Sequence, residues 1–110
     1  MEKSKIETYL GFSIRSRNII FGAEMIEKKK KGVFLLVIDG SIGKNSLKSI
    51  LNAQEKLGCP LYSTDAGVLA EWVHRPAVKA AAITDKNLAL AIISSADSEP
   101  RFKLYSGGNN

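Results

Sequence analysis

The segment Val33–Ile38 is a continuous apolar run that follows a cluster of lysines. A strand with one face in water alternates apolar and polar residues, whereas an unbroken apolar run is typical of a strand covered on both faces. Val33–Ile38 therefore predicts a central strand of a layered α/β fold.

Strand-like and helix-like segments alternate along the chain. The pair Ser4 and Glu7 fits a capping box at the start of a first helix. We expect helices at Ser4–Arg15, Ala23–Lys30, from a cap at Asn45 or Ser46 to Leu57, from a cap at Asp65 to Val73, and at Lys86–Ser94, and strands at Asn18–Phe21, Val33–Ile38, Leu61–Thr64 and Val78–Ile83. This order predicts a three-layer α/β/α sandwich around a mixed, mostly four-stranded sheet.

The helix and strand pattern ends near residue 94. We therefore expect a single domain over residues 1–94 and a flexible C-terminal tail over residues 95–110. Phe102, Leu104 and Tyr105 are apolar exceptions in this tail and could dock on the domain.

The chain is basic, with 16 Lys and Arg against 11 Asp and Glu and a formal charge of +5. For so small a domain this balance favours an anionic partner, although it also suits a surface that only aids solubility. Cys59 is the single cysteine, so no internal disulfide can form. We expect no metal and no cofactor. The absence of a signal peptide and of an apolar run of about 18 residues predicts a cytoplasmic protein without a membrane partner.

The cations gather around the first predicted strand. Arg15 and Arg17 precede it, and Lys28 to Lys31 follow it. One interpretation of the lysines is a solvated face that complements the negative end of a helix dipole. The other is a phosphate-binding surface, which requires the arginines, the lysines and Arg75 to fold into one patch beside Phe21 and Gly22.

Other chemical motifs are weak. The loop Gly40-Ser-Ile-Gly-Lys44 has the context of a phosphate loop, but its glycine spacing is too short and Asn45 stands where Ser or Thr would hold magnesium. Nucleotide binding there is a third, weaker hypothesis. Asp39, Asp65 and Asp85 lie near strand ends, and capping explains at least the last two. His74 has no catalytic neighbour in sequence, and Trp72 has the spacing of a core residue. We expect no enzyme activity.

The ordered set of segments resembles the kink-turn RNA-binding ribosomal protein superfamily of archaeal and eukaryotic large subunits, and is most similar to its bacterial YlxQ-like members. The resemblance covers about Ile6 to Ser94. It rests on Arg15-Ser-Arg-Asn-Ile-Ile-Phe-Gly22 with Glu24 and Lys28, Val33–Asp39, Cys59-Pro60, Val68-Leu-Ala70, and Val78–Asp85 running into Leu88-Ala89.

The resemblance implies an α/β/α fold and a monomer that binds structured RNA such as a kink-turn or ribosomal RNA. Family members use the first turn of the helix after the first strand and the loop before the last strand. By position, these are Gly22, Ala23, Glu24 and Lys28 on one side and His74, Arg75 and Pro76 on the other. Together with the cations, the predicted RNA-binding residues are Arg15, Arg17, Asn18, Gly22, Ala23, Glu24, Lys28, Lys29, Lys30, His74, Arg75 and Pro76.

Some family positions differ in this chain. Glu24-Met25 stands where close kink-turn readers carry Asn-Glu, and Ala70 and His74 replace glycines. The first hypothesis remains a non-enzymatic RNA-binding protein whose Arg17, Lys28, Lys29, Lys30 and Arg75 hold the backbone, while Glu24 accepts from a base edge. The alternative is a protein-interaction module that keeps the fold and has lost specific RNA recognition.

Overall fold

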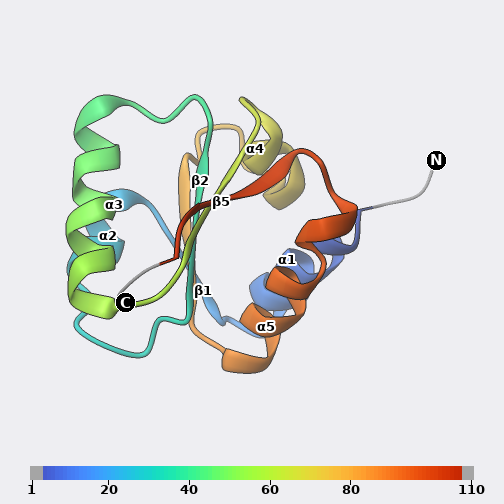
Figure 1. The fold of residues 1–110 in the computed structure, drawn as a ribbon, viewed down its shortest axis with the longest axis horizontal. Coiled ribbons are helices and arrows are strands. Elements are labelled where there is room, and N and C mark those ends of the chain that lie inside the picture. The colour runs from blue at the N-terminus through green and yellow to red at the C-terminus, as the bar shows by residue number, and fades with distance from the viewer. Residues whose placement is uncertain (1–3, 108–110) are drawn as a thin grey trace.

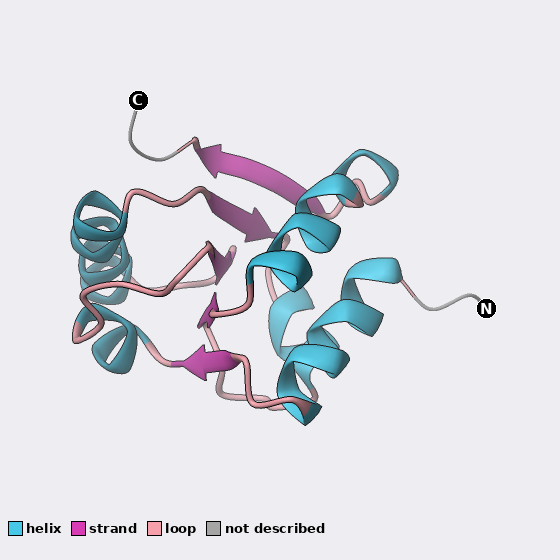
Figure 2. Ribbon diagram, turned by 90° about the horizontal axis from the view of Figure 1, so that it is seen from below, coloured by secondary structure: helices cyan, strands magenta, loops and turns pink. Residues whose placement is uncertain are grey.

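The structure is a computed structural model that describes residues 4–107. A central sheet separates two helical layers, with α2 and α3 on one face and α1, α4 and α5 on the other (Figures 1 and 2). The elements are α1 (Lys5–Arg15), β1 (Ile19–Phe21), α2 (Ala23–Glu27), β2 (Leu35–Asp39), α3 (Lys44–Leu57), β3 (Leu61–Thr64), α4 (Val68–Val73), β4 (Ala80–Ile83), α5 (Lys86–Ser94), the 3-10 helix η1 (Ala96–Ser98) and β5 (Phe102–Ser106). This confirms the predicted α/β sandwich.

The sheet is mixed and has the order β1-β4-β2-β3-β5. β2 and β3 are parallel, and β4 runs antiparallel to both β1 and β2. The sheet therefore has two ends that differ in which strands begin and finish there. At the first, which we call the Gly22 end, β1 and β2 finish and β4 begins. Here the N–H of Gly22 donates to the Ala80 carbonyl at 3.0 Å, and the N–H of Asp39 donates to the Lys79 carbonyl at 2.9 Å.

The second end, the Asn18 end, lies where β4 finishes and β1 and β2 begin. Here the N–H of Thr84 donates to the Asn18 carbonyl at 2.9 Å, and the N–H of Phe34 donates to the Ile83 carbonyl at 2.9 Å. A residue that precedes β1 and a residue that follows β1 therefore lie at different ends of the sheet.

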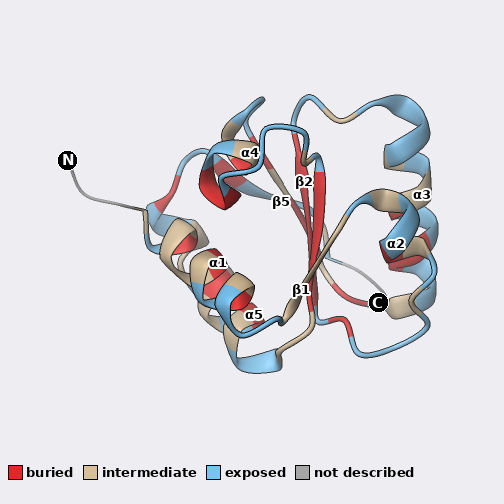
Figure 3. Ribbon diagram, turned by 180° about the vertical axis from the view of Figure 1, so that it is seen from behind, coloured by how far each residue is buried: buried red, intermediate tan, exposed pale blue. Residues whose placement is uncertain are grey.

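β2 is the covered central strand that the apolar run predicts. Leu35 and Val37 face the core beneath α1, α4 and α5, while Leu36 and Ile38 face the core beneath α2 and α3. All of its residues are buried, as Figure 3 shows. Two apolar cores on opposite faces of one strand account for the absence of any polar alternation.

The sheet has five strands, so the expected four-stranded sheet and flexible tail are wrong. η1 and β5 occupy half of the segment assigned to the tail, and β5 pairs antiparallel with β3. Phe102 is 2% exposed, and its ring stacks on Tyr62 at a centroid distance of 4.7 Å. The single domain therefore extends beyond residue 94. The last part of the predicted tail, residues 108–110, lies outside the described residues.

Two helix starts and one helix end differ from expectation, and one predicted capping box is incomplete. The Ser4 hydroxyl caps α1 by accepting from the Ile6 N–H, but Glu7 does not complete a capping box and lies beside His74 instead. Gly43, rather than Asn45 or Ser46, is the N-cap of α3, and Gly67, rather than Asp65, is that of α4. α2 ends at Glu27, before the lysines that were expected to extend it.

Within residues 4–107, none of the helices combines the length and the apolar character needed to cross a membrane.

Candidate functional site

The turn between β1 and α2 forms one half of the predicted site. Gly22 has φ 94° and ψ 132°, a backbone conformation that side chains other than hydrogen strongly disfavour. Ala23 begins α2, and Glu24 and Met25 are exposed beside it. The glycine therefore sets the sharp change of direction that presents Glu24 and Met25 at the Gly22 end.

The loop between α4 and β4 forms the other half. His74 ends α4 with φ 58°, and its Nε2 lies 3.2 Å from Glu7 Oε2 of α1. The Arg75 guanidinium lies 4.6 Å from the centroid of the Phe21 ring, and one of its nitrogens donates to the Val73 carbonyl at 3.2 Å. Pro76 follows and is exposed. The structure thus brings the two predicted recognition segments together at the Gly22 end.

Lys79 belongs to the same end, although sequence reasoning missed it. Its Nζ donates to Ser41 Oγ at 2.6 Å, and Ser41 Oγ in turn donates to the Asp39 carboxylate. The sequence signal for Lys79 was its position directly before β4, because a loop residue next to a strand lies at one end of the sheet. With Arg75, it places two cations at this end.

A groove runs along this surface. It is lined by Gly67, Ala70, Glu71, His74, Arg75, Pro76 and Lys79. Glu24 and Glu71 are also exposed here, so the Gly22 end mixes both signs of charge. Glu71 has a partner of its own, because Arg101 lies 3.8 Å from its carboxylate. Among the described residues, no carboxylate lies within ion-pair distance of Arg75 or Lys79.

Asp39 is a buried residue at the end of β2, and its carboxylate binds the start of α4. Burial would raise the pKa of its carboxyl, but hydrogen bonds from the Gly67 N–H, the Ser41 hydroxyl and N–H and the Leu69 N–H outweigh burial and lower the pKa to about 2. Asp39 is therefore ionised and caps α4 from the end of β2, which is a structural role.

Arg15, Arg17 and Asn18 lie at the other end of β1, so the expected single patch does not form. Arg15 is the last residue of α1 and covers the Phe12 ring at 4.8 Å. Arg17 is exposed in a left-handed turn with φ 61°. The Asn18 side chain donates to Ser16 Oγ at 2.9 Å. Four residues lie between Arg17 and Gly22, three of them in β1, and this strand places Arg17 and Gly22 at opposite ends of the sheet.

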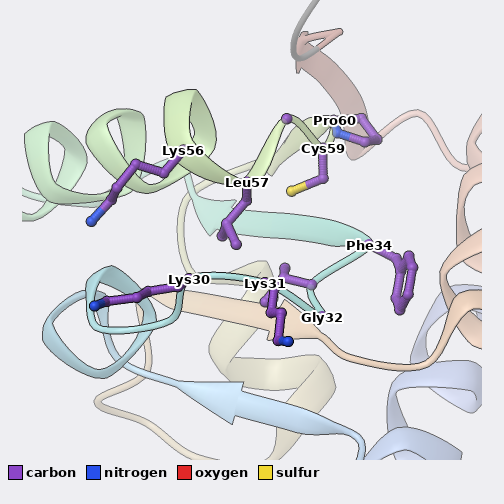
Figure 4. A pocket seen from close by; sticks show the side chains of 10 residues that line it. Lys30, Lys31, Gly32, Phe34, Lys56, Leu57, Cys59 and Pro60 are labelled. Carbon is purple, nitrogen blue, oxygen red and sulfur yellow. The ribbon is translucent and has the colours of Figure 1, made fainter.

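The lysine run leads from α2 toward the Asn18 end. Lys28 is the C-cap of α2, and Lys29 continues that turn with its N–H donating to the Ile26 carbonyl at 3.0 Å. Lys30 and Lys31 lie in the following loop and line a second groove with Lys56 of α3 (Figure 4). Sequence reasoning also missed Lys56, whose place in the last turn of α3 was the only signal.

The other residues that the sequence singled out have structural roles, or they have no neighbouring group that indicates catalysis or metal binding. Trp72 is buried in the core, as predicted. Asp85 accepts from the Leu88 N–H and caps α5, which confirms that prediction. Burial raises the pKa of the Cys59 thiol to about 11, which suppresses the reactive thiolate. In the part of the chain that the structure describes, no three His, Cys, Asp or Glu residues are grouped as metal ligands would be.

Comparison with known proteins gives the fold alone. No protein-family model matches the sequence, and no curated protein does either. A solved structure from Bacillus halodurans C, described as a protein with unknown function, matches with a TM-score of 0.74 and 17% sequence identity. The match covers 86% of this chain and 99% of that one. The chain is therefore similar in fold to a protein whose function is itself undetermined.

Proposed function

We propose that the protein is a non-enzymatic RNA-binding protein that binds structured RNA, such as a kink-turn or ribosomal RNA, through the Gly22 end. The observation that carries this proposal is the position of Arg75 on the Phe21 ring, directly before the Gly22 turn. Two segments far apart in sequence meet there, and they are the two that the family resemblance implies. The proposal includes a monomeric, cytoplasmic protein that needs no cofactor.

The chemistry of the Gly22 end suits an RNA backbone that bends. A guanidinium held on an aromatic ring offers planar N–H groups to phosphate oxygens and a surface for an unpaired base. Lys79 adds a second cation, held in place by Ser41. Glu24 repels phosphates but accepts hydrogen bonds from amino groups on base edges, which favours contact with a base at that point.

Binding of a kink-turn RNA and of a plain duplex, measured by fluorescence anisotropy at several salt concentrations, tests the proposal. The expected result is tighter binding of the kink-turn. Arg75→Ala should weaken it roughly 5- to 150-fold, as expected for the loss of a specific contact worth about 1–3 kcal/mol. Arg75→Lys should recover only part of this affinity, because lysine keeps the charge but loses the planar fork.

The matched control for charge is Lys5→Ala, which removes one exposed cation from α1. It should leave kink-turn binding nearly unchanged. Failure of the unmodified protein to bind either RNA at low salt would rule the proposal out. Equal and steeply salt-dependent binding of both RNAs would reduce it to charge attraction.

A protein-interaction module is the second candidate, and Met25 favours it. Met25 is 56% exposed beside Glu24, and both residues differ from those that close kink-turn readers carry at these positions. An apolar side chain in such a position suits a protein surface better than a phosphate. Arg75→Glu should abolish RNA binding under the first candidate, whereas a protein contact centred on Met25 should survive Arg75→Glu and be lost in Met25→Ser.

A further inference from the structure

The lysine groove lies away from the Gly22 end and has a composition of its own. It is lined by Lys30, Lys31, Gly32, Val33, Phe34, Lys56, Leu57, Gly58, Cys59 and Pro60, from the loop before β2 and the turn between α3 and β3. Lys30 and Lys31 are exposed, and neither has a hydrogen bond or an ion pair in the part of the chain that the structure describes. Such cations remain available for an external anion.

Lys56 joins this cluster because its ammonium is held toward the loop. Its Nζ donates to the Glu27 carbonyl at 3.0 Å, and Figure 4 shows its side chain reaching from α3 toward the loop that carries Lys30. Glu27 and Glu55 are the nearby carboxylates in sequence, and the Glu27 side chain already accepts from Asn52 at 3.4 Å. Against Lys28 to Lys31 and Lys56, these two leave a clear positive excess.

Phe34 gives the groove an aromatic side. Phe34 is 39% exposed, although Val33 and Leu35 on either side are only 5% and 0% exposed. Its backbone N–H donates to the Ile83 carbonyl at 2.9 Å, so the ring projects from a backbone that is fixed to the sheet. Figure 4 places this ring on the side of the groove opposite the ends of Lys30 and Lys56.

We propose that the lysine groove is a second nucleic-acid site, which binds single-stranded RNA. The lysines hold the phosphates of the strand, and Phe34 stacks on one of its bases. A basic groove combined with an exposed aromatic ring is the arrangement by which proteins bind single strands, since every base offers a flat face for stacking. The groove lies toward the Asn18 end, so it contacts a different part of an RNA from the one bound at the Gly22 end.

The test is anisotropy with a fluorescein-labelled 12-nucleotide oligouridine. Lys30→Glu with Lys31→Glu should weaken binding at least tenfold more than the control pair Lys5→Glu with Lys48→Glu, which changes the net charge equally at exposed positions of α1 and α3. Lys30→Gln with Lys31→Gln should lower the slope of log affinity against log salt by about 1.4, or about 0.7 for each lost phosphate contact.

The aromatic contact is tested with a matched pair of phenylalanines. Phe34→Ala should weaken oligouridine binding by roughly 5- to 150-fold, the range for loss of stacking on one base. Phe12→Ala removes the ring of a residue that is 43% exposed on α1 and should leave binding unchanged. Circular dichroism should show that both variants fold.

Several outcomes would overturn the proposal. They are no oligouridine binding by the unmodified protein at low salt, equal losses in the two charge-reversed pairs, or no loss in a folded Phe34→Ala variant. The Gly22 end is judged separately, because Arg75→Ala should impair kink-turn binding while leaving oligouridine binding intact.

Discussion

The buried carboxylate of Asp39 accepts a hydrogen bond from the backbone N–H of Leu69 at 3.0 Å. The same carboxylate accepts from the Gly67 N–H at 2.9 Å and from the Thr64 hydroxyl at 3.2 Å. The N-cap of α4 is Gly67, which has no side chain to satisfy the free N–H groups of the first turn. Asp39 supplies that cap from β2 and thereby fixes the helix whose last residues lead into Arg75.

We expect Asp39→Asn to lower the free energy of unfolding at pH 7 by about 2–4 kcal/mol, because a charged acceptor of several buried hydrogen bonds is lost. The pKa of Asp39 in the folded protein is about 2, below its ordinary 3.8. A lowered pKa stabilises the fold above about pH 4, and this stabilisation of about 2 kcal/mol disappears as the pH falls toward 2. Urea denaturation at pH 7, 4 and 2.5 should show the difference between the two proteins shrinking.

The control for Asp39 is Asp97→Asn, which changes an exposed carboxylate of η1 and should shift stability by less than about 0.5 kcal/mol. The buried Glu99 also has a lowered pKa, because the Arg101 side chain donates to it, but it titrates in both proteins and cancels in the comparison. A gap between the Asp39 variant and the unmodified protein that stays constant down to pH 2.5 would contradict this account.

Gly40 is required by close packing at the end of β2. A Cβ at this position would lie 2.7 Å from the Thr64 carbonyl oxygen and 3.0 Å from the Ala66 nitrogen, both backbone atoms that cannot turn aside. Gly40→Ala should therefore destabilise the fold by about 1–3 kcal/mol. Gly43→Ser is the control, since a Cβ there meets nothing within 4 Å.

A serine at the N-cap of α3 should be neutral or stabilising by a few tenths of a kcal/mol, roughly the advantage of a serine cap over glycine. Thermal unfolding followed by circular dichroism ranks the two variants. Equal melting temperatures for Gly40→Ala and the unmodified protein would show that the β2–α3 loop can move away from β3.

Phe102 anchors β5 in the core. Besides stacking on Tyr62, its ring lies 6.2 Å from that of Trp72. Phe102→Ala should lower the free energy of unfolding by about 3–5 kcal/mol. Leu104→Ala, on the same strand but 55% exposed, should change it by less than about 0.5 kcal/mol. Urea titration followed by Trp72 fluorescence provides the measurement, and similar losses in both variants would mean that β5 contributes through its backbone alone.

The fold was predictable where the apolar pattern was strong. The run Val33–Ile38 indicated a covered central strand, helical spacing indicated α1 and α3, and the cap at Asp85 indicated α5. β5 was missed because only Phe102 of its residues is clearly buried, so an edge strand after a polar segment carries little hydrophobic signal. α2 was overextended because lysine favours helix, whereas the chain must turn at Gly32, with φ 81°, to enter β2.

The candidate site was predictable in its parts and not in its arrangement. The resemblance indicated the segments at Gly22 and Arg75, which the structure brings together. Clustering of cations along the sequence indicated one patch, yet Arg17 and Gly22 lie on opposite sides of a three-residue strand. Proximity in sequence says nothing about which end of a strand a residue occupies, so only the strand order could separate the two groups.

β1 has three residues and pairs only with β4 among the described strands, and each of its side chains is half-buried. Few hydrogen bonds and little apolar surface therefore resist its local opening, whereas β2 can open only if both cores are disrupted. A ligand could shift the Gly22 turn at low free-energy cost while the rest of the sheet stays intact. The contact at the Gly22 turn is therefore adaptable because β1, the strand that supports it, lies at the edge of the sheet.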